Sequence, residues 1–529
     1  MEFPQLLLSA GALTPVALMA AAALRPRFPS SSTAGLWRVF QALSLAALLM
    51  TIANLGLVLR AAQIPATFSA PLSDYLLASP LGLSMAVLVQ LLGTVIGAFS
   101  ARYLQGEDGQ KRYLAALAAV LAAVHLLLLA DHWVILIAAW ALVGLALQHL
   151  LCFYPNRAFA QLAAHKKRIA DRVADTLLIA AAALAWAEVG SGSLSALWAH
   201  LARDGMSLPL QLSALALVMA VVLRTALMPV HGWLIQVMEA PTPVSALLHA
   251  GVVNLGGFVL IRFAPLLEQA MSARALLLVF GLGTAILAGM VMLTRISIKV
   301  RLAWSTVAQM GFMLLECALG LYTLAALHLI GHSLYKAHAF LSASTVVRQT
   351  RLQALHSAAP PAALNLALAP LITIAALLLI QSLSGHTAWP WWWSAVLGLA
   401  WAPLLWQPAG PAGLRLRSTQ TLFGLLIVFG LSAATLLAHT LPLGIQDAPH
   451  HTLGLIALAG MAALYACLAL LQLRPQALSR WRQWSYAGFY VDEAYTRMAL
   501  HLWPSGWTPE PHKCPAPQAA APKLADAPY

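Results

Sequence analysis

Residues 238–262 read MEAPTPVSALLHAGVVNLGGFVLIR, and this stretch decides what kind of protein the chain is. It is long and apolar enough to cross a bilayer, which takes about 20 residues. Pro241 and Pro243 lie within it, and proline interrupts a helix because it lacks a backbone N–H. His249 lies in its middle. We expect a discontinuous membrane helix with an ionisable group at membrane depth, a combination that often flanks an ion site.

The whole chain has the composition of a membrane protein. Of its 529 residues 61% are apolar and only 9% are charged, whereas typical soluble domains are about 25% charged. This composition excludes a cytosolic enzyme, a nucleic-acid-binding protein and a disordered chain. The four cysteines (Cys152, Cys317, Cys467 and Cys514) have no CxxC spacing. They predict neither a disulfide framework nor a zinc or iron–sulfur site, so we expect no cofactor in this chain.

About 15 segments have the length and hydropathy of membrane-spanning helices, and their period is not that of a β-barrel. The predicted fold class is an all-α polytopic membrane protein with about 14–15 transmembrane helices. The expected spans lie near 4–24, 36–59, 81–103, 112–130, 133–153, 168–188, 209–228, 241–263, 274–294, 301–320, 322–346, 361–384, 388–406, 419–441 and 452–472.

The distribution of Lys and Arg predicts the orientation. Alternate loops hold 17 of these residues and the other loops hold four, and the alternation runs unbroken along the chain. Cytoplasmic loops collect positive charge, so the pattern predicts an outer N-terminus, a cytoplasmic C-terminus and an odd number of helices. The same pattern accounts for the net charge of +13, because the excess of Lys and Arg lies in the loops expected to be cytoplasmic. The first segment follows Glu2 and has no basic region before it, which predicts a retained helix and not a signal peptide.

One expected helix carries three ionisable side chains on one face. His328, His332 and Lys336 are spaced i, i+4 and i+8. Groups about 6 Å apart with water between them are suited to proton hopping, and burial can bring a lysine pKa towards neutrality. The alternative is a structural polar seam between helices. Other ionisable residues within expected spans are His125, Asp175, Arg224, His249 and Glu316.

After about residue 474 the composition changes. Arg480–Trp503 mixes aromatic and charged residues, which indicates an amphipathic surface helix, a docking segment, or a solvated tail anchored by its aromatics. Residues 504–529 are rich in Pro and Ala and are expected to be disordered.

Three motifs follow one another in a fixed order: MEAPTPVSALLHA at 238–250, KVRLAWSTVAQMG at 299–311 and HLIGHSLYKA at 328–337. Asp131 and Asp175 precede them in matching positions. Together they resemble the antiporter-like subunits of respiratory complex I and of multisubunit Na⁺/H⁺ antiporters, over roughly residues 80–350.

That resemblance implies two inverted five-helix repeats with discontinuous helices and a midplane chain of charged groups that carries protons. The implied proton path is His249, His328, His332 and Lys336, with Asp175 and Arg224 as an ion pair and Glu239 as a candidate cytoplasmic entrance. The expected divisions are 1–110 for N-terminal transmembrane helices, 111–260 for the first repeat, 261–410 for the second, 411–474 for C-terminal transmembrane helices, and 475–529 for a cytoplasmic amphipathic segment and tail.

The chain departs from the resembled pattern at two positions of the first repeat. Ala141 follows Trp140 where the family has a glutamate, and Arg224 stands where the family has a lysine. Arginine stays protonated in proteins and is a poor proton relay. Asp175 is the nearest candidate to neutralise it. In the second repeat the expected lysine is also absent, since residues 352–414 contain no Lys or Arg. These changes argue against an ordinary complex I pump module.

Two stretches narrow the resemblance: HAGVVNLGGFVLIRFAPL at 249–266 and AGFYVDEAYTR at 487–497. They look like the membrane subunit of the DAB inorganic-carbon accumulation complex. This implies a bacterial inner-membrane protein with a periplasmic N-terminus and a large cytoplasmic DabA-like partner that carries a zinc site like that of β-carbonic anhydrase. The chain itself would be no enzyme but a transport and coupling subunit, in which proton-motive force drives CO₂ hydration in the partner.

Two other functions stay open at this point. A proton-pumping subunit of an NADH-quinone oxidoreductase or hydrogenase-linked complex is disfavoured by the altered Glu and Lys positions. A Na⁺/H⁺ antiporter subunit would favour a carboxylate cage around sodium. The expected spans supply only Asp175 and Glu316 as buried acids.

Overall fold

The computed structural model describes residues 3–27, 32–60, 72–343, 360–385, 388–407, 409, 414–474 and 476–504. Within these ranges every regular element is a helix, apart from two isolated β-bridges. The prediction of an all-α polytopic membrane protein is confirmed.

Ten helices in the described part of the chain are long and apolar enough to cross a membrane. The other expected spans also hold helices. Two of them, α6 (Ala158–Val189) and α15 (Tyr322–Leu341), carry ionisable side chains that lower their hydropathy, and two others, α8 (Leu208–Arg224) and α18 (Trp391–Trp401), are shorter. The ten are α2 (Thr33–Arg60), α3 (Pro80–Tyr103), α4 (Gln110–Leu129), α5 (Trp133–Leu151), the pair α10 and α11 (Thr242–Arg262), α13 (Met271–Met292), α14 (Ile298–Leu319), α17 (Ala363–Ser384), α19 (Leu414–His439) and α20 (His451–Leu473). The others are α1 (Phe3–Leu24), α6 (Ala158–Val189), α8 (Leu208–Arg224), α15 (Tyr322–Leu341) and α18 (Trp391–Trp401).

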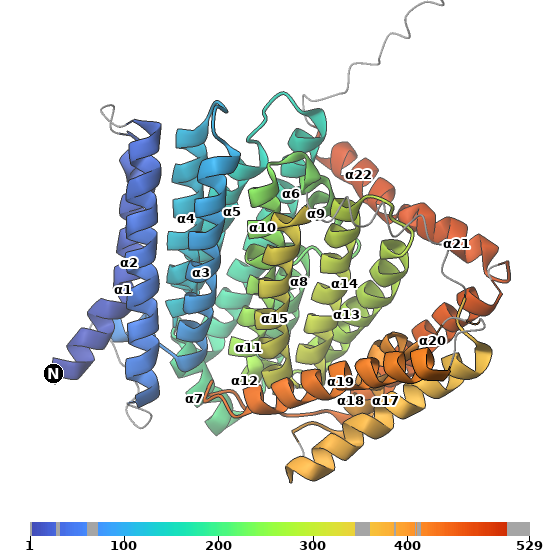
Figure 1. Ribbon diagram of the computed structural model, residues 1–529. Helices are drawn as coiled ribbons and strands as arrows, with labels where there is room; N and C mark the ends of the chain where they lie inside the picture. Colours follow the sequence, from blue (N-terminus) through green and yellow to red (C-terminus); the bar gives the residue numbers. More distant parts are fainter. Residues whose placement is uncertain are drawn as a thin grey trace, which may run out of the picture.

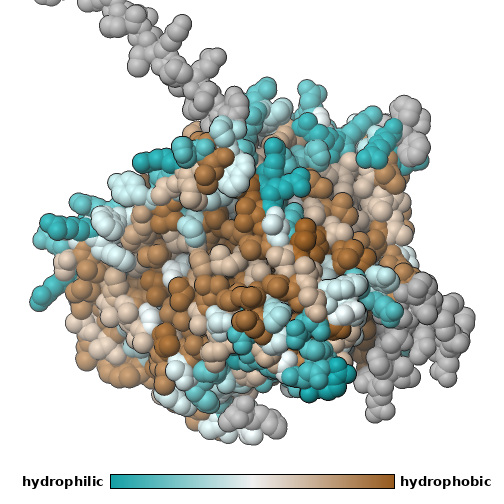
Figure 2. Space-filling model, turned by 180° about the vertical axis from the view of Figure 1, so that it is seen from behind, coloured by the Kyte–Doolittle hydropathy of each residue, from teal (hydrophilic) through white to brown (hydrophobic). Residues whose placement is uncertain are grey.

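The helices form one upright bundle and one inclined group. Figure 1 shows α1–α6 side by side, then the helices α8–α15, with α17–α20 lying at a steep angle to them. The inclined group packs on the bundle through α20 against α13 and α14, and through α19 against α15. Seen from behind, apolar residues fill the middle of the surface and hydrophilic residues gather above and below (Figure 2). This is the pattern expected of a chain with a lipid-facing belt.

The discontinuous helix lies where the sequence predicted it, but its break has a different cause. Pro243 stands in the first turn of α10 (Thr242–Ala250), where its missing N–H costs nothing. The prolines therefore begin a helix and do not interrupt one. The break falls at Gly251 and the short 3₁₀ turn Val252–Asn254, before α11 (Leu255–Arg262).

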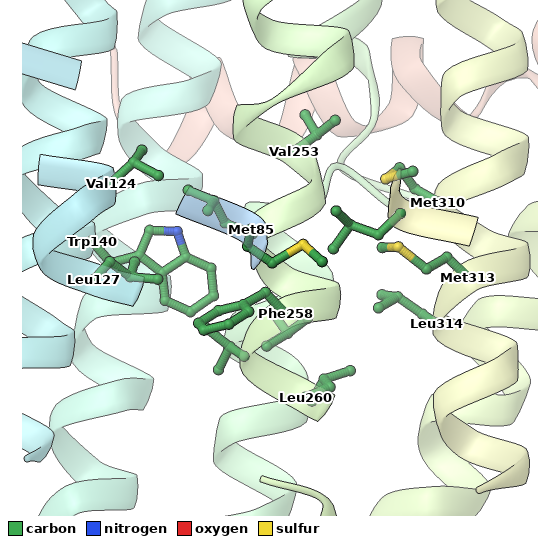
Figure 3. Close-up of a cluster of buried hydrophobic side chains, with 14 of the residues drawn as sticks. Met85, Val124, Leu127, Trp140, Val253, Phe258, Leu260, Met310, Met313 and Leu314 are labelled. Atoms are coloured by element: carbon green, nitrogen blue, oxygen red, sulfur yellow. The ribbon is translucent and has the colours of Figure 1, made fainter. Parts of the chain in front are cut away.

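Helix α11 lies between α8 and α14 and contacts both. Its consecutive glycines face opposite neighbours: a side chain at Gly256 would collide with Thr225 at the end of α8, and one at Gly257 would collide with Met313 of α14. The residues around it form a continuous apolar layer (Figure 3). That layer includes Val124, Leu127, Trp140, Met85, Val253, Phe258, Leu260, Met310, Met313 and Leu314.

The C-terminal segment folds back onto the helical bundle. It consists of α21 (Ser479–Tyr486), a 3₁₀ turn (Gly488–Tyr490) and α22 (Val491–Leu502). Tyr495 and Ala499 form its buried face, and α22 packs against α6 and α9 (Gly232–Gln236). The amphipathic helix expected from the sequence is therefore packed against other helices of the same chain. Of the Pro/Ala-rich tail, residues 505–529 lie outside the described residues. The divisions at 110, 260, 410 and 474 stay predictions.

Two glycines set the crossing of α13 and α14. A Cβ at Gly311 would lie 2.8 Å from the backbone carbonyl oxygen of Gly281 and 2.8 Å from the backbone nitrogen of Ala285. Such close approach is possible only between small residues, and it is a common way to pack helices in membranes. It gives a structural reason for the glycine that ends the motif at 299–311.

We predict that Gly311→Ala lowers the stability of the detergent-solubilised protein by about 1–3 kcal/mol, because the added methyl group meets backbone and not a movable side chain. Thermal unfolding measures the change. Gly283→Ala is the matched control: it lies on α13, and a Cβ there would meet nothing within 4 Å. Equal melting temperatures for the two variants would contradict the packing argument.

Candidate functional site

The three ionisable residues of α15 form a column inside the protein. His332 is 6% exposed and Lys336 is 1% exposed. The ring centroids of His328 and His332 are 6.1 Å apart. Charged or titratable groups are buried only when they are partnered or functional. What touches each of these residues therefore decides what the column can do.

At one end of the column, Lys336 is held by α14. Its ammonium donates a 2.9 Å hydrogen bond to the carbonyl oxygen of Leu302 and another hydrogen bond to the hydroxyl of Ser305. Both acceptors are neutral, so no carboxylate fixes the proton on the lysine. Sequence reasoning did not assign Ser305 a role, although it lies in the quoted motif at 299–311.

At the other end, His328 meets a buried acid. Its Nδ1 lies 2.9 Å from Oε2 of Glu316 on α14, which is 4% exposed. Beyond them Asp447, in the loop before α20, accepts a 2.7 Å hydrogen bond from the backbone N–H of Thr323 in the first turn of α15. Burial raises the pKa of Asp447 above its usual range. Asp447 could not be found from local sequence patterns, because it lies more than 100 residues from the helix that it contacts.

His249 lies at the end of α10, next to the break in the discontinuous helix. Its ring stacks on Phe340 of α15 with centroids 4.6 Å apart. Among the described residues, neither of its ring nitrogens has a hydrogen-bond partner, and the same holds for His332. Buried polar atoms of this kind are normally satisfied by ordered water. The two imidazoles are therefore suited to water-linked proton transfer.

The break is tied to the same helix through Asn254. Its side-chain amide donates 2.9 Å and 2.7 Å hydrogen bonds to the carbonyl oxygen of Ala250 and the hydroxyl of Ser333 on α15. One residue thus holds the open end of α10 and fixes it to the column. His249, His328, His332 and Lys336 are brought together by the contact of α10 with α15.

The second cluster surrounds Arg224, at the end of α8. The structure places its guanidinium against the carboxylate of Asp175. A 2.8 Å hydrogen bond also joins the guanidinium to the carbonyl oxygen of Trp140, whose ring lies 5.2 Å below. The two residues of the expected ion pair are therefore in contact. Whether the pair is fixed or switches stays a prediction.

Helix α6 adds Lys167 and Asp171 to this cluster, and sequence reasoning missed both residues. Lys166 and Lys167 were counted among loop residues, but α6 begins at Ala158 and both lysines are buried within it. Lys167 pairs with Asp171, and Asp171 lies 3.9 Å from Arg224. Lys166 lies 2.5 Å from Asp492 of α22. The spacing of Lys167, Asp171 and Asp175 at i, i+4 and i+8 was the signal that could have identified this cluster.

The remaining predicted residues lie apart from the two clusters. Glu239 is 40% exposed at its side chain and lies 3.5 Å from Arg157, at the same end of the bundle as Lys166, so it stays a candidate entrance. His125 is a core histidine hydrogen-bonded at 2.8 Å to Gln90. Among the residues that the structure describes, no three His, Cys, Asp or Glu side chains gather as metal ligands.

The sequence is similar to a known membrane family. A family model described as NADH:quinone oxidoreductase/Mrp antiporter, transmembrane, matches residues 130–402. A protein of Hydrogenovibrio crunogenus named probable inorganic carbon transporter subunit DabB is 38% identical over 444 residues, which is 81% of this chain and 83% of that protein. The DabB2 protein of Halothiobacillus neapolitanus is 41% identical over 64% of this chain and 63% of its own length.

Two solved structures share the fold. The Mrp complex of Dietzia matches with a TM-score of 0.55 at 21% identity, over 94% of this chain and 55% of the matched chain. The archaeal membrane-bound sulfane sulfur reductase matches with a TM-score of 0.57 at 16% identity, over 93% of this chain and 99% of that chain.

We predict that Asp175→Leu destabilises the protein more than the double variant Asp175→Leu/Arg224→Leu. Removing one partner of a buried pair leaves a charge without compensation, at a cost of about 3–5 kcal/mol, whereas removing both costs much less. Thermal unfolding and the yield of monodisperse protein measure the difference. A double variant less stable than the single one would show that Arg224 contributes more through Trp140 and Asp171 than through Asp175.

Proposed function

Because this chain belongs to the family of the DabB inorganic carbon transporter subunits, within the NADH:quinone oxidoreductase/Mrp antiporter membrane proteins, we propose that it is the proton-conducting, energy-coupling subunit of an inorganic-carbon accumulation complex. In this proposal it lies in a bacterial inner membrane with a periplasmic N-terminus and a cytoplasmic C-terminus. The observation that carries the proposal is the buried column formed by Glu316, His328, His332 and Lys336.

The proposed path follows the column from the end of the bundle at Asp447 towards the end that is rich in Lys and Arg. A proton reaches Glu316 and His328, whose side chains are in hydrogen-bond contact. It passes along α15 to His332 and Lys336, which are one helical turn apart. His249 connects this helix to the break at Gly251, and each step of more than about 3 Å needs water. The neutral contacts of Lys336 favour release of its proton, because neither contact is a carboxylate that would stabilise the ammonium.

The chemistry belongs to a partner in this proposal. The partner is a large cytoplasmic subunit of the DabA type with a zinc site like that of β-carbonic anhydrase, and it converts CO₂ to bicarbonate. Moving one charge down the membrane potential releases ~2.3 kcal/mol per 100 mV. That free energy corresponds to more than about tenfold accumulation per proton. This chain contributes the conducting path and no catalytic residue.

A redox-driven proton pump is the second candidate, because the fold is shared with respiratory membrane complexes. The Arg224 cluster speaks against it. The pumps that the sequence resembles have a lysine at this position, which can gain and lose a proton, whereas an arginine held by two acids and a carbonyl does neither.

Affinity purification of the tagged chain from its native membrane, with mass spectrometry and metal analysis, tests the partner. We expect one large soluble subunit and about one zinc ion per complex. Recovery of flavin and iron–sulfur subunits would overturn the carbon-accumulation proposal in favour of the redox pump.

We predict that His332→Gln lowers inorganic-carbon uptake by cells at least about tenfold, because glutamine keeps hydrogen bonding but cannot carry a proton. His338→Gln is the matched control, since His338 lies on the same helix with an exposed side chain. Uptake of labelled inorganic carbon measures the effect, with protein levels in the membrane compared. If the His332→Gln variant takes up inorganic carbon at the wild-type rate, the column is not the proton path.

A further inference from the structure

One face of α6 carries a second ladder of charges, separate from the α15 column. Lys167, Asp171 and Asp175 are spaced i, i+4 and i+8, so they stand one above another over about 12 Å. Arg224 of α8 lies against the two acids. With Arg224 included, two cations balance two acids, so the four charges sum to zero.

The lysine at the start of this ladder is deeply buried. The side chain of Lys167 is 5% exposed, and its ammonium pairs with Asp171 and lies 5.6 Å from the ring centre of Trp233 on α9. A buried ammonium–carboxylate pair is expensive to keep ionised, and transfer of one proton within the pair makes both partners neutral. The pair can therefore exist in two protonation states without adding net charge.

Asp171 is placed between two cations. On one side it contacts Lys167, and on the other it lies 3.9 Å from Arg224. Opposite it stands Gly144 of α5, where a Cβ would lie 2.8 Å from the carboxylate and 3.4 Å from the guanidinium. Because this glycine has no side chain, the carboxylate has room to approach either cation. The side chains of Asp171 and Asp175 remain 17% and 19% exposed, so neither carboxylate is sealed off.

We propose that Lys167 and Asp171 form a proton-exchanging pair that makes the half of the protein around Arg224 conductive; this inference rests on the proposed function. An N–H bond of the Lys167 ammonium breaks and an O–H bond forms on Asp171. Asp171 then gives that proton to the carboxylate of Asp175, directly or through water, and becomes ionised again. A hydronium ion gives a new proton to the neutral amine of Lys167, and the O–H bond on Asp175 breaks as its proton passes to water, so that one proton has moved along α6 and the starting charges are restored.

Arg224 makes this exchange possible without itself titrating. Two carboxylates share one guanidinium, so whichever acid is ionised neutralises it while the other holds the proton. The arginine is a positioning residue that keeps both acids within reach. The conducting groups of this half therefore lie on α6 and not on α8.

Proton flux into liposomes containing the purified complex, driven by an imposed potential and followed with a pH-sensitive dye, tests the inference. The decisive variant is Lys167→Arg, which preserves the positive charge and the ion pair but cannot release a proton. We expect it to lower the flux at least about tenfold with the complex intact. Arg172→Gln is the control, because Arg172 is exposed on the same helix.

A second variant covers the case in which arginine does not fit. Lys167→Met/Asp171→Leu removes both charges together, which leaves no unpaired ion and preserves folding; we expect the same loss of flux. Wild-type flux in either variant would assign the ladder a purely structural role. Lys336→Met, measured alongside, separates the two proposals. Loss of flux there with full flux in Lys167→Arg refutes this inference alone, whereas no flux in the unaltered complex refutes the proposed function.

Discussion

The cost of placing a charge in a low-dielectric interior governs this structure. An ionised side chain at membrane depth is stable only with a partner, and the described interior follows that rule in two different ways. Around Arg224 the charges are paired with opposite charges. Along α15 a single lysine is held by a carbonyl and a hydroxyl, and the neighbouring groups are imidazoles, which can be neutral. In the first arrangement a proton can move only by exchange within a pair, whereas in the second it can pass between groups that are already neutral.

The apolar layer around α11 keeps these two arrangements apart. Phe258 lies between Trp140 and the methionines of α14 (Figure 3). A pair of adjacent glycines lets α11 fit closely against both α8 and α14. Helix α11 therefore contacts both sides, while apolar side chains separate the two groups of charges.

The sequence could predict the all-helical class, the face shared by His328, His332 and Lys336, and the contact of Arg224 with Asp175, because these depend on local spacing or on the cost of an unpaired charge. It could not predict what depends on tertiary contacts. Lys166 and Lys167 looked like loop residues because α6 is charged at its start, yet α22 and α9 bury them. Asp447 reaches α15 from a distant loop. The break at Gly251 was assigned to the prolines, because their harmless position in the first turn of α10 becomes visible only when the helix start is known.

The contact between α22 and α6 has a consequence for the protein during its synthesis. Lys166 is fully buried, and its partner Asp492 follows it by 326 residues. During synthesis the lysine therefore enters its site long before its counter-ion exists. A ribosome-bound or prematurely terminated chain presents an uncompensated ammonium next to Gly232, where the carboxylate of Asp492 would otherwise fill the space. A chain that stops before Asp492 therefore keeps a buried lysine in α6 without its counter-ion.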